Sequence, residues 1–334
     1  MKLSVIIAAY NVESFIEKCV RSCYDFSLQE DYEIIVVNDG SNDSTLQIIE
    51  RLKLEIYNLI IVTKHNQGLG AARNTGIEIS RAEYVWMIDG DDFLESNSIV
   101  NVLSILSKQS NDVLTFNFNV VKEKKNHSYI RFPPKYIETI LSGSNYYNKY
   151  FQNSYTWQYI FKKKLFIQNQ LKFQERINMQ DSEILPKIMF YTTTVLYIDA
   201  VFYNYVQQEN SFTNTNNFQK RINYFESIII VKKSLENFSV SIKDKDILLY
   251  EALLLKIKSL DEVVLNHVVY YRYSTKSLKK IITLLSKNNF YPFKFRPPGK
   301  LRLIKFGLNC TPVITNILIN YLISINSIFR FRLL

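Results

Sequence analysis

Three carboxylates stand within four residues at the end of an apolar segment. Residues 84–88 are strand-forming, and they run directly into Asp89, Asp91 and Asp92, with Gly90 inside the cluster. Carboxylates this close repel one another unless a cation or hydrogen-bond donors offset their charge. Hard oxygen ligands at a rigid strand end suit Mg²⁺ or Mn²⁺, especially when phosphate oxygens complete the coordination. Standing alone, the segment would fit a solvated acidic turn equally well.

Strand and helix patterns alternate over about the first 120 residues. The expected strands cover residues 3–9, 33–37, 59–63, 84–88 and 113–121. The expected helices cover residues 12–23, 69–79 and 96–109, with a further helix capped at Asp43 or Ser44 and running through Leu52. Repeated units of this kind predict an α/β fold, Rossmann-like, with a mostly parallel central sheet and helices on both faces.

Unusual residues follow each of the first four expected strands. Tyr10 and Asn11 follow the first, Asp39 the second, the segment 65–73 the third and the acidic cluster the fourth. In parallel sheets, ligands bind beyond the carboxyl ends of the strands. The convergence of these residues at one edge therefore predicts a ligand site that includes the acidic cluster.

The chemistry available at this edge suits a nucleotide diphosphate. A carboxylate at Asp39 can accept an N–H from a pyrimidine ring, and Tyr10 offers a flat face for stacking. Gly68 permits close backbone approach. A guanidinium at Arg73, one turn into the expected helix, suits a pyrophosphate or a base carbonyl. A divalent ion at the acidic cluster would neutralise that pyrophosphate as a leaving group.

Charge is unevenly distributed along the 334 residues, whose overall net charge is +10. Residues 1–120 hold 9 Lys and Arg against 17 Asp and Glu, and residues 121–334 hold 32 against 14, which gives −8 and +18. This asymmetry predicts different partners for the two regions. A basic region could face nucleic acid, an anionic membrane surface or a phosphate-bearing substrate. Because nothing in it resembles a nucleic-acid-binding module, we expect no nucleic-acid partner.

Cysteines and apolar runs bear on location. Cys19, Cys23 and Cys310 do not predict a disulfide framework, and Cys19 with Cys23 predicts core packing rather than a zinc site. The apolar run at the N-terminus is too short for a signal peptide, and no window of about 18 residues is uninterruptedly apolar. We expect a cytoplasmic protein, with the inner face of the cell membrane as an alternative location.

Four blocks resemble the family 2 glycosyltransferases with the GT-A fold. They are Leu-Ser-Val-Ile-Ile-Ala-Ala-Tyr-Asn (3–11), Glu-Ile-Ile-Val-Val-Asn-Asp-Gly-Ser-Asn-Asp-Ser (33–44), Asn-Gln-Gly-Leu-Gly-Ala-Ala-Arg-Asn-Thr-Gly (66–76) and Ile-Asp-Gly-Asp-Asp (88–92). Three positions depart mildly from the family pattern: Ala8 replaces the usual proline, Asn38 a common Asp, and Gly90 a frequent serine.

A weaker resemblance, to the acceptor half of bacterial polysaccharide-type members, continues to about residue 213. It rests on Trp157 with 161–163, on 171–173, on Gln180-Asp181, on Phe202-Tyr203-Asn204-Tyr205 and on 210–213. In those relatives an acidic pair supplies the catalytic base. Here the pair reads Gln180-Asp181, so the role passes to Asp181, with Glu183 as its rival.

The resemblance implies an inverting glycosyltransferase that uses a nucleotide diphosphate sugar. The donor is expected to be a UDP-hexose or UDP-N-acetylhexosamine, and the acceptor a hydroxyl of a growing surface glycan, lipid-linked or protein-linked. Asp181 would be the base, Mg²⁺ or Mn²⁺ would bind at Asp91, and Asp92 would support it. The implied donor-binding residues are Ala9, Tyr10, Asn11, Asp39, Gly68, Arg73, Asp89 and Gly90.

Two other functions would use similar parts. A nucleotidyltransferase also pairs an α/β sheet with metal-binding carboxylates, but it would need a glycine-rich basic loop after the first strand, and residues 8–11 lack one. A non-catalytic carbohydrate-binding or scaffold protein could retain the fold. The presence of Asp39, Arg73, Asp91 and Asp181 argues against that alternative.

The predicted domains are a GT-A domain over residues 1–216 and a helical region over residues 217–334. The first divides into a nucleotide-sugar half (1–120) and an acceptor half (121–216). The second includes a basic hinge at 293–305 and an amphipathic segment at 312–329. We expect this tail to contact other copies of the chain, making a homo-oligomer, or a membrane surface. A helix packed on its own domain is the third alternative.

Overall fold

A computed structural model describes residues 1–28, 30–122, 140–150, 154–207, 217–271, 273–295, 297 and 301–318. The chain divides into two compact units. The first comprises Met1–Thr215 together with Ser241–Ala252, and the second comprises Asn216–Val240 together with Leu253–Leu334. The predicted site residues all lie in the first unit.

A nine-stranded sheet forms the centre of the first unit, with the path β3-β2-β1-β4-β8-β6-β9-β5 and with β7 paired to β9. The strands are β1 (Leu3–Ala9), β2 (Tyr32–Asn38), β3 (Leu59–Thr63), β4 (Tyr84–Asp89), β5 (Phe93–Leu94), β6 (Val113–Lys122), β7 (Ile140–Leu141), β8 (Tyr159–Lys162) and β9 (Val195–Gln207). Every residue of β1 and β2 is buried, as expected of continuous apolar runs in a sheet covered on both faces.

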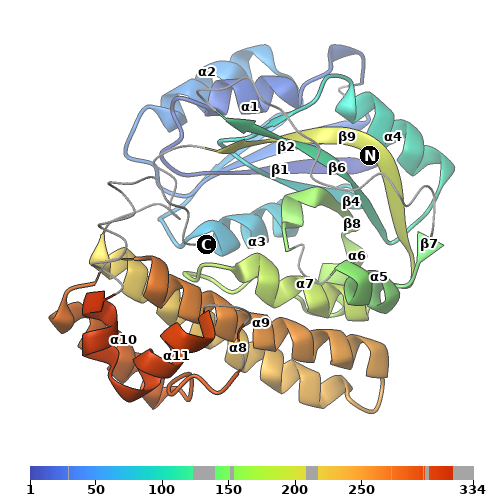
Figure 1. Ribbon diagram of the computed structural model, residues 1–334. Coiled ribbons are helices and arrows are strands. Elements are labelled where there is room, and N and C mark those ends of the chain that lie inside the picture. Colours follow the sequence, from blue (N-terminus) through green and yellow to red (C-terminus); the bar gives the residue numbers. More distant parts are fainter. Residues whose placement is uncertain are drawn as a thin grey trace. The chain divides into compact units, whose positions relative to one another are not determined.

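Helices cover both faces of this sheet. Figure 1 shows α1, α2 and α4 on one face and α3 and α7 on the other. The helical elements are α1 (Ile16–Ser22), η1 (Phe26–Leu28), α2 (Thr45–Glu55), α3 (Leu69–Ile79), α4 (Ser98–Lys108), α5 (Gly143–Tyr150), η2 (Thr156–Gln158), α6 (Lys164–Gln168) and α7 (Gln180–Phe190). The α/β layers and the predicted strand–helix alternation are thereby confirmed.

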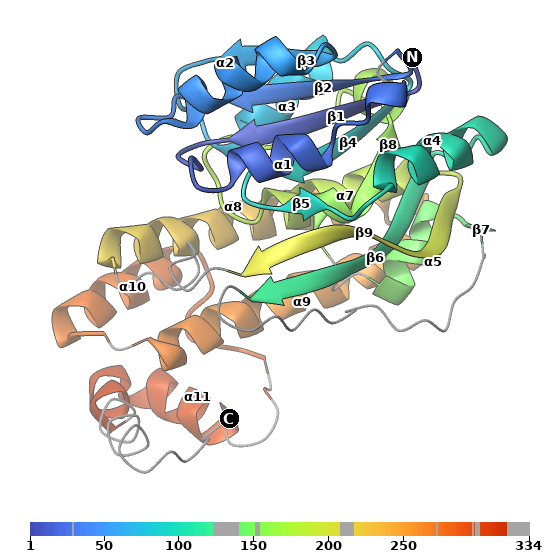
Figure 2. The same cartoon turned by 90° about the horizontal axis from the view of Figure 1, so that it is seen from above.

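The predicted mostly parallel sheet is confirmed, with parallel pairing along β3-β2-β1-β4 and between β6 and β9. Beyond β4 the sheet is mixed, because β8 runs antiparallel to both of its neighbours and β5 and β7 run antiparallel to β9. β6 and β9 are parallel and lie side by side in Figure 2. The difference arises after residue 121, where the strand–helix repeat on which the prediction rested has ended.

Gly76 in α3 packs directly against Ile6 of β1. A Cβ built on Gly76 would stand 2.2 Å from Ile6 Cγ2 of the buried strand. A larger residue must therefore displace the Ile6 side chain or the helix, and such overpacking costs about 1–3 kcal/mol.

We accordingly expect Gly76→Ala to lower the free energy of unfolding by about 1–3 kcal/mol in urea titrations. Glu78→Ala, an exposed change two residues further along the same helix, is the control and should stay within about 0.5 kcal/mol of the wild type. Equal stability of the Gly76 and Glu78 variants would contradict the close contact.

The second unit is built on the predicted helical pattern. The labelled helices after residue 217 are α8 (Phe218–Ile242), α9 (Ile247–Tyr270), α10 (Thr275–Lys287) and α11 (Leu301–Cys310), and residues 312–318 are helical as well. Helices α8 and α9 also contribute residues to the first unit. Apolar positions of the predicted helical pattern are buried: Phe225, Ile228, Leu260 and Val264.

The predicted basic hinge is partly wrong, because α11 begins at Leu301 and residues 301–305 are therefore helical. Two of its basic side chains form hydrogen bonds within the segment. Arg302 donates to the carbonyl of Pro297 at 3.1 Å, and Lys305 donates to the carbonyl of Phe295 at 2.7 Å. Residues 312–318 of the predicted amphipathic segment are helical.

Several predicted features concern residues that the structure does not describe. They are residues 319–329 of the amphipathic segment, the basic residues Arg296 and Lys300 of the hinge, and the family string at 210–213. Within the described residues, no helix is long and apolar enough to span a membrane. All three cysteines carry free thiols, with Cys19 and Cys23 buried in the core.

Candidate active site

The register of the parallel strands brings the predicted site residues to one edge. Ala8 of β1 pairs with Asp89 of β4, and Ala9 pairs with Asn38 of β2. Two backbone hydrogen bonds continue this alignment past the strands, from the Asp39 amide to the Ala9 carbonyl at 2.8 Å and from the Gly90 amide to the Ala8 carbonyl at 3.1 Å. The carboxyl ends of β1, β2 and β4 are therefore aligned side by side at one edge of the sheet.

Gly90 is needed where it stands. A Cβ at this position would lie 2.9 Å from the Ala8 carbonyl oxygen and 3.3 Å from Val12 Cγ2. The absence of a side chain lets the acidic turn lie directly against the end of β1.

Asp39 fastens the loop that precedes α3. Its buried carboxylate accepts hydrogen bonds from the amide of Gly68 at 2.7 Å and from that of Gln67 at 3.1 Å. Gly68 has a φ of 90°, a left-handed conformation that glycine adopts without strain. Asp39 thus fixes the loop, and its contact with a pyrimidine stays a prediction.

Tyr10 and Asn11 follow β1 directly and lie at the same edge of the sheet. The Tyr10 side chain is 46% exposed. Asn11 has a φ of 51°, its Oδ1 accepts from the Asn42 amide at 2.8 Å, and its own amide donates to Ser41 Oγ at 3.1 Å. The loops after β1 and β2 are therefore joined, and the Tyr10 ring is left accessible for stacking.

Arg73 lies buried between two carboxylates that are distant in sequence. One Nη donates to Asp89 Oδ1 at 2.8 Å and the other donates to Asp181 Oδ1, while the side chain is only 1% exposed. Burial acts to lower the pKa of Arg73, but the charges of Asp181 and Asp89 outweigh it and raise that pKa. The structure thus brings Arg73, Asp89 and Asp181 together, with the guanidinium as the link.

Asp92 is anchored more deeply than its two neighbours. Its carboxylate accepts from the Tyr203 hydroxyl at 2.6 Å and from the Val206 amide at 2.7 Å, and the residue is 2% exposed. Burial, followed by the charges of Asp91 and Asp89, raises the pKa of Asp92 well above its usual value. Asp92 therefore ties the acidic turn to β9.

Asp91 is the carboxylate of the cluster best suited to a cation. Burial and the nearby charge of Asp89 raise the pKa of Asp91 to about 6. A divalent ion would relieve both effects, and carboxylate oxygen is a ligand that Mg²⁺ and Mn²⁺ prefer. Among the described residues, no group of three or more His, Cys, Asp or Glu side chains could hold a metal alone. The residues thus fit an ion whose remaining ligands come from a phosphate group.

Asp181 and Glu183 occupy the first turn of α7 but have different surroundings. Asp181, 17% exposed, accepts from Arg73 at Oδ1 and from the Thr156 amide at Oδ2, at 3.2 Å for the latter. Glu183 is 3% exposed and forms an ion pair with Lys187 one turn further along. Asp181 is thus the more accessible carboxylate and the one connected to the acidic cluster.

Two neighbours of the site, Tyr203 and Thr156, had no site role in the sequence interpretation, although Tyr203 belongs to one of the strings that carry the family resemblance. Tyr203 reaches Asp92 and also accepts from the Asp89 amide at 3.3 Å, and the Thr156 amide holds Asp181. Two-residue alternation in Phe202-Tyr203-Asn204-Tyr205 places both tyrosines on one face of a strand, which is the signal that could have drawn attention to them.

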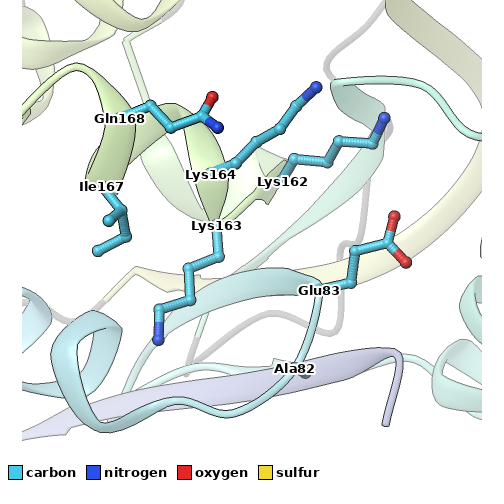
Figure 3. A pocket seen from close by; sticks show the side chains of 7 residues that line it. All are labelled: Ala82, Glu83, Lys162, Lys163, Lys164, Ile167 and Gln168. Atoms are coloured by element: carbon cyan, nitrogen blue, oxygen red, sulfur yellow. The ribbon is translucent and has the colours of Figure 1, made fainter.

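A separate pocket of about 480 Å³ lies near the amino end of β4. Figure 3 shows its lining residues, Ala82, Glu83, Lys162, Lys163, Lys164, Ile167 and Gln168. Lys162 donates to the Ser110 carbonyl and to Asp112, and Lys163 donates to the Ser80 carbonyl just after α3. These lysines hydrogen-bond the segments before β6 and after α3, near the amino end of β4, whereas the acidic cluster lies at the carboxyl end of β4.

Comparisons with known proteins identify the family to which the chain belongs. The model of the family Glycosyl transferase family 2 matches residues 4–172. Glycosyltransferase GlyA of Streptococcus pneumoniae serotype 4 is 27% identical over 222 residues, which cover 61% of this chain and 30% of that protein. The uncharacterized glycosyltransferase EpsJ of Bacillus subtilis is 30% identical over 224 residues, which cover 63% of this chain and 62% of that protein. The chain thus spans less than two thirds of the length of either relative.

Solved structures share the fold over nearly the whole chain. Residues 1–349 of S. aureus TarS, in complex with UDP-GlcNAc, align with a TM-score of 0.67 and 19% sequence identity, covering 96% of this chain and 90% of that one. The likeness confirms the predicted GT-A type of fold.

Proposed function

Because the chain belongs to glycosyl transferase family 2, we propose that it moves a sugar from a UDP-sugar to a hydroxyl of a bacterial surface glycan, with inversion. The observation that carries this proposal is the buried bridge from Asp89 through Arg73 to Asp181. It fixes the predicted base at a set position relative to the carboxylate at the donor edge. A transfer between two bound substrates needs that kind of fixed geometry.

The donor is proposed to be a UDP-hexose or a UDP-N-acetylhexosamine. The accessible Tyr10 ring and the buried Asp39 carboxylate lie at adjoining strand ends, where a pyrimidine could stack and donate its N–H. The TarS fragment, which shares this fold, has been solved with UDP-GlcNAc. Ala9, Asn11, Gly68 and Gly90 would shape the backbone around the nucleotide, and Asp89 would face its ribose.

Asp181 is proposed to act as the general base in a single displacement. Its carboxylate takes the proton of the acceptor hydroxyl while that oxygen attacks the anomeric carbon. The bond from that carbon to the diphosphate oxygen breaks, and UDP leaves from the opposite face of the sugar. Arg73 holds Asp181 in position and, being buried in two ion pairs, acts through Asp181 and Asp89.

A divalent ion, Mg²⁺ or Mn²⁺, would be held by Asp91 and by the diphosphate. When bound, such an ion neutralises charge that develops on the leaving diphosphate. Asp92, through its bonds to Tyr203 and the Val206 amide, keeps the acidic turn in place for it.

Asp39→Ala is expected to weaken UDP binding by about 1–3 kcal/mol, because the pyrimidine loses its acceptor and the loop at Gly68 loses its anchor. Isothermal titration calorimetry with UDP measures the effect. Asp112→Ala is the matched control, since Asp112 is another buried carboxylate that accepts backbone and side-chain bonds, at the far end of the sheet. Equal UDP affinity of the two variants would remove Asp39 from the nucleotide site.

Release of UDP from a panel of UDP-sugars, with Mn²⁺ or with excess chelator, tests the proposed function as a whole. We expect slow hydrolysis of at least one UDP-hexose or UDP-N-acetylhexosamine with Mn²⁺ and none with chelator. Failure of every UDP-sugar to bind or turn over would overturn the proposal. Release of pyrophosphate from a nucleoside triphosphate and a sugar phosphate would indicate a nucleotidyltransferase instead.

A further inference from the structure

Four aromatic side chains form a stack beside the acidic cluster and the base. Trp157 is buried and lies face to face with Tyr203, at 4.4 Å between ring centroids and 5° between planes. Tyr155 and Tyr205 stack on the same indole at 5.0 Å and 5.6 Å, each at 21°. We call these four residues the aromatic stack. Its two outer rings, Tyr155 and Tyr205, are partly exposed.

The outer rings of the stack are attached to the catalytic groups through the backbone. Tyr155 directly precedes Thr156, whose amide holds Asp181. Tyr203, two residues before Tyr205, and Val206, directly after it, both donate a hydrogen bond to Asp92. The two outer rings, tilted toward each other with centroids 6.3 Å apart, thus come from the two segments that hold the proposed base and Asp92.

Neighbouring aromatic residues hold the central Trp157 of the stack in place. Trp157 accepts a hydrogen bond from Trp86 Nε1 at 2.9 Å through its carbonyl, and its ring meets the edge of Phe118 at 4.7 Å. Burial, followed by the charge of Asp92, raises the pKa of Tyr205 to about 12, so its hydroxyl stays protonated and can donate. A preformed aromatic surface with polar tips loses little entropy on binding a ligand.

We infer that Tyr155 and Tyr205 form the subsite for the acceptor, and that the acceptor group stacked there is a hexopyranose ring. The negative faces of aromatic rings attract the positive C–H face of a ligand, and a pyranose presents such a face whereas an open-chain polyol does not. A sugar stacked on this pair would have a hydroxyl beside Asp181. The inference rests on the proposed function, and it adds the chemical class of the acceptor.

Saturation-transfer-difference NMR on the full chain with UDP and Mn²⁺ tests the inference. The probes are methyl β-glucopyranoside, methyl β-galactopyranoside and methyl N-acetyl-β-glucosaminide, with ribitol as the polyol that has no ring. We expect ring C–H signals from at least one glycoside and none from ribitol. Tyr155→Leu and Tyr205→Leu keep apolar volume but remove the aromatic face, and each should weaken glycoside binding about tenfold or more, or about 1.4 kcal/mol. Tyr155→Phe and Tyr205→Phe should retain binding.

Three results would overturn the inference: no binding of any glycoside, binding of ribitol as strong as that of the glycosides, or unchanged glycoside affinity in the Leu variants. Calorimetry with UDP on each variant separates this from the proposed function. UDP affinity is expected to be the same in all five proteins, because the aromatic stack does not include the nucleotide residues. Failure of the wild type to bind UDP in calorimetry would instead overturn the proposed function. Glycoside binding is measured separately, by NMR, so the two failures can be told apart.

Discussion

Asp181→Asn is expected to lower the rate of sugar transfer by about 10²–10⁴-fold, the range for loss of a general base. The amide keeps the shape of the side chain, and its one oxygen can still accept from Arg73, whereas the Thr156 amide loses the acceptor that Asp181 Oδ2 provides. Donor binding should be unaffected, because Asp181 contacts the acceptor and not the nucleotide. Initial rates of transfer and UDP calorimetry on the same preparation measure both quantities.

Glu183→Gln is the matched control for that result. Glu183 lies in the same turn of α7, but it is buried and paired with Lys187. Its amide variant should lose stability through the broken ion pair and retain most of its turnover. The assignment of the base would be wrong if the Glu183 variant alone lost transfer while both variants still bound UDP.

The core strands could be predicted closely because their signal is local. The bounds predicted for β1, β3 and α3 agree with the structure to the residue. A continuous apolar run has one stable location in an α/β protein, between two layers of helices. The predicted helix at 12–23 is shorter in the structure and begins at Ile16, because residues 11–15 form the loop that follows β1.

The mixed half of the sheet could not be read from local pattern. β8 has only four residues, and it gains its place by pairing antiparallel with Tyr84–Trp86 of β4 and with Val113–Thr115 of β6. Such pairings join segments many residues apart, and no periodicity within the strand itself specifies its neighbours. Prediction from the sequence therefore failed where long-range pairing decides the direction of a strand.

For the site, the residue types were predictable and their partners were not. The chemistry of a guanidinium one turn into the helix suggested that Arg73 binds a pyrophosphate or a base carbonyl, and that contact stays a prediction. The structure pairs this guanidinium with Asp89 and Asp181. A buried guanidinium needs carboxylate partners, but which of the chain's acids they would be depends on how α7 is placed against α3.

Asp91→Asn is expected to abolish metal-dependent turnover and leave the fold intact. Burial and the charge of Asp89 raise the pKa of Asp91 to about 6. At neutral pH, both effects therefore disfavour the ionised form of this carboxylate. Removing the charge therefore relieves a repulsion in the metal-free protein, whose free energy of unfolding should stay unchanged or rise. The same change should abolish the shift in melting temperature that Mn²⁺ with UDP produces in the wild type. Asp43→Asn, at a partly buried acid on the loop before α2 that accepts from the Glu13 and Thr45 amides, is the control and should keep both turnover and the shift. Full activity of the wild type in excess EDTA, or a normal Mn²⁺-dependent shift in the Asp91 variant, would defeat the assignment of the ion to Asp91.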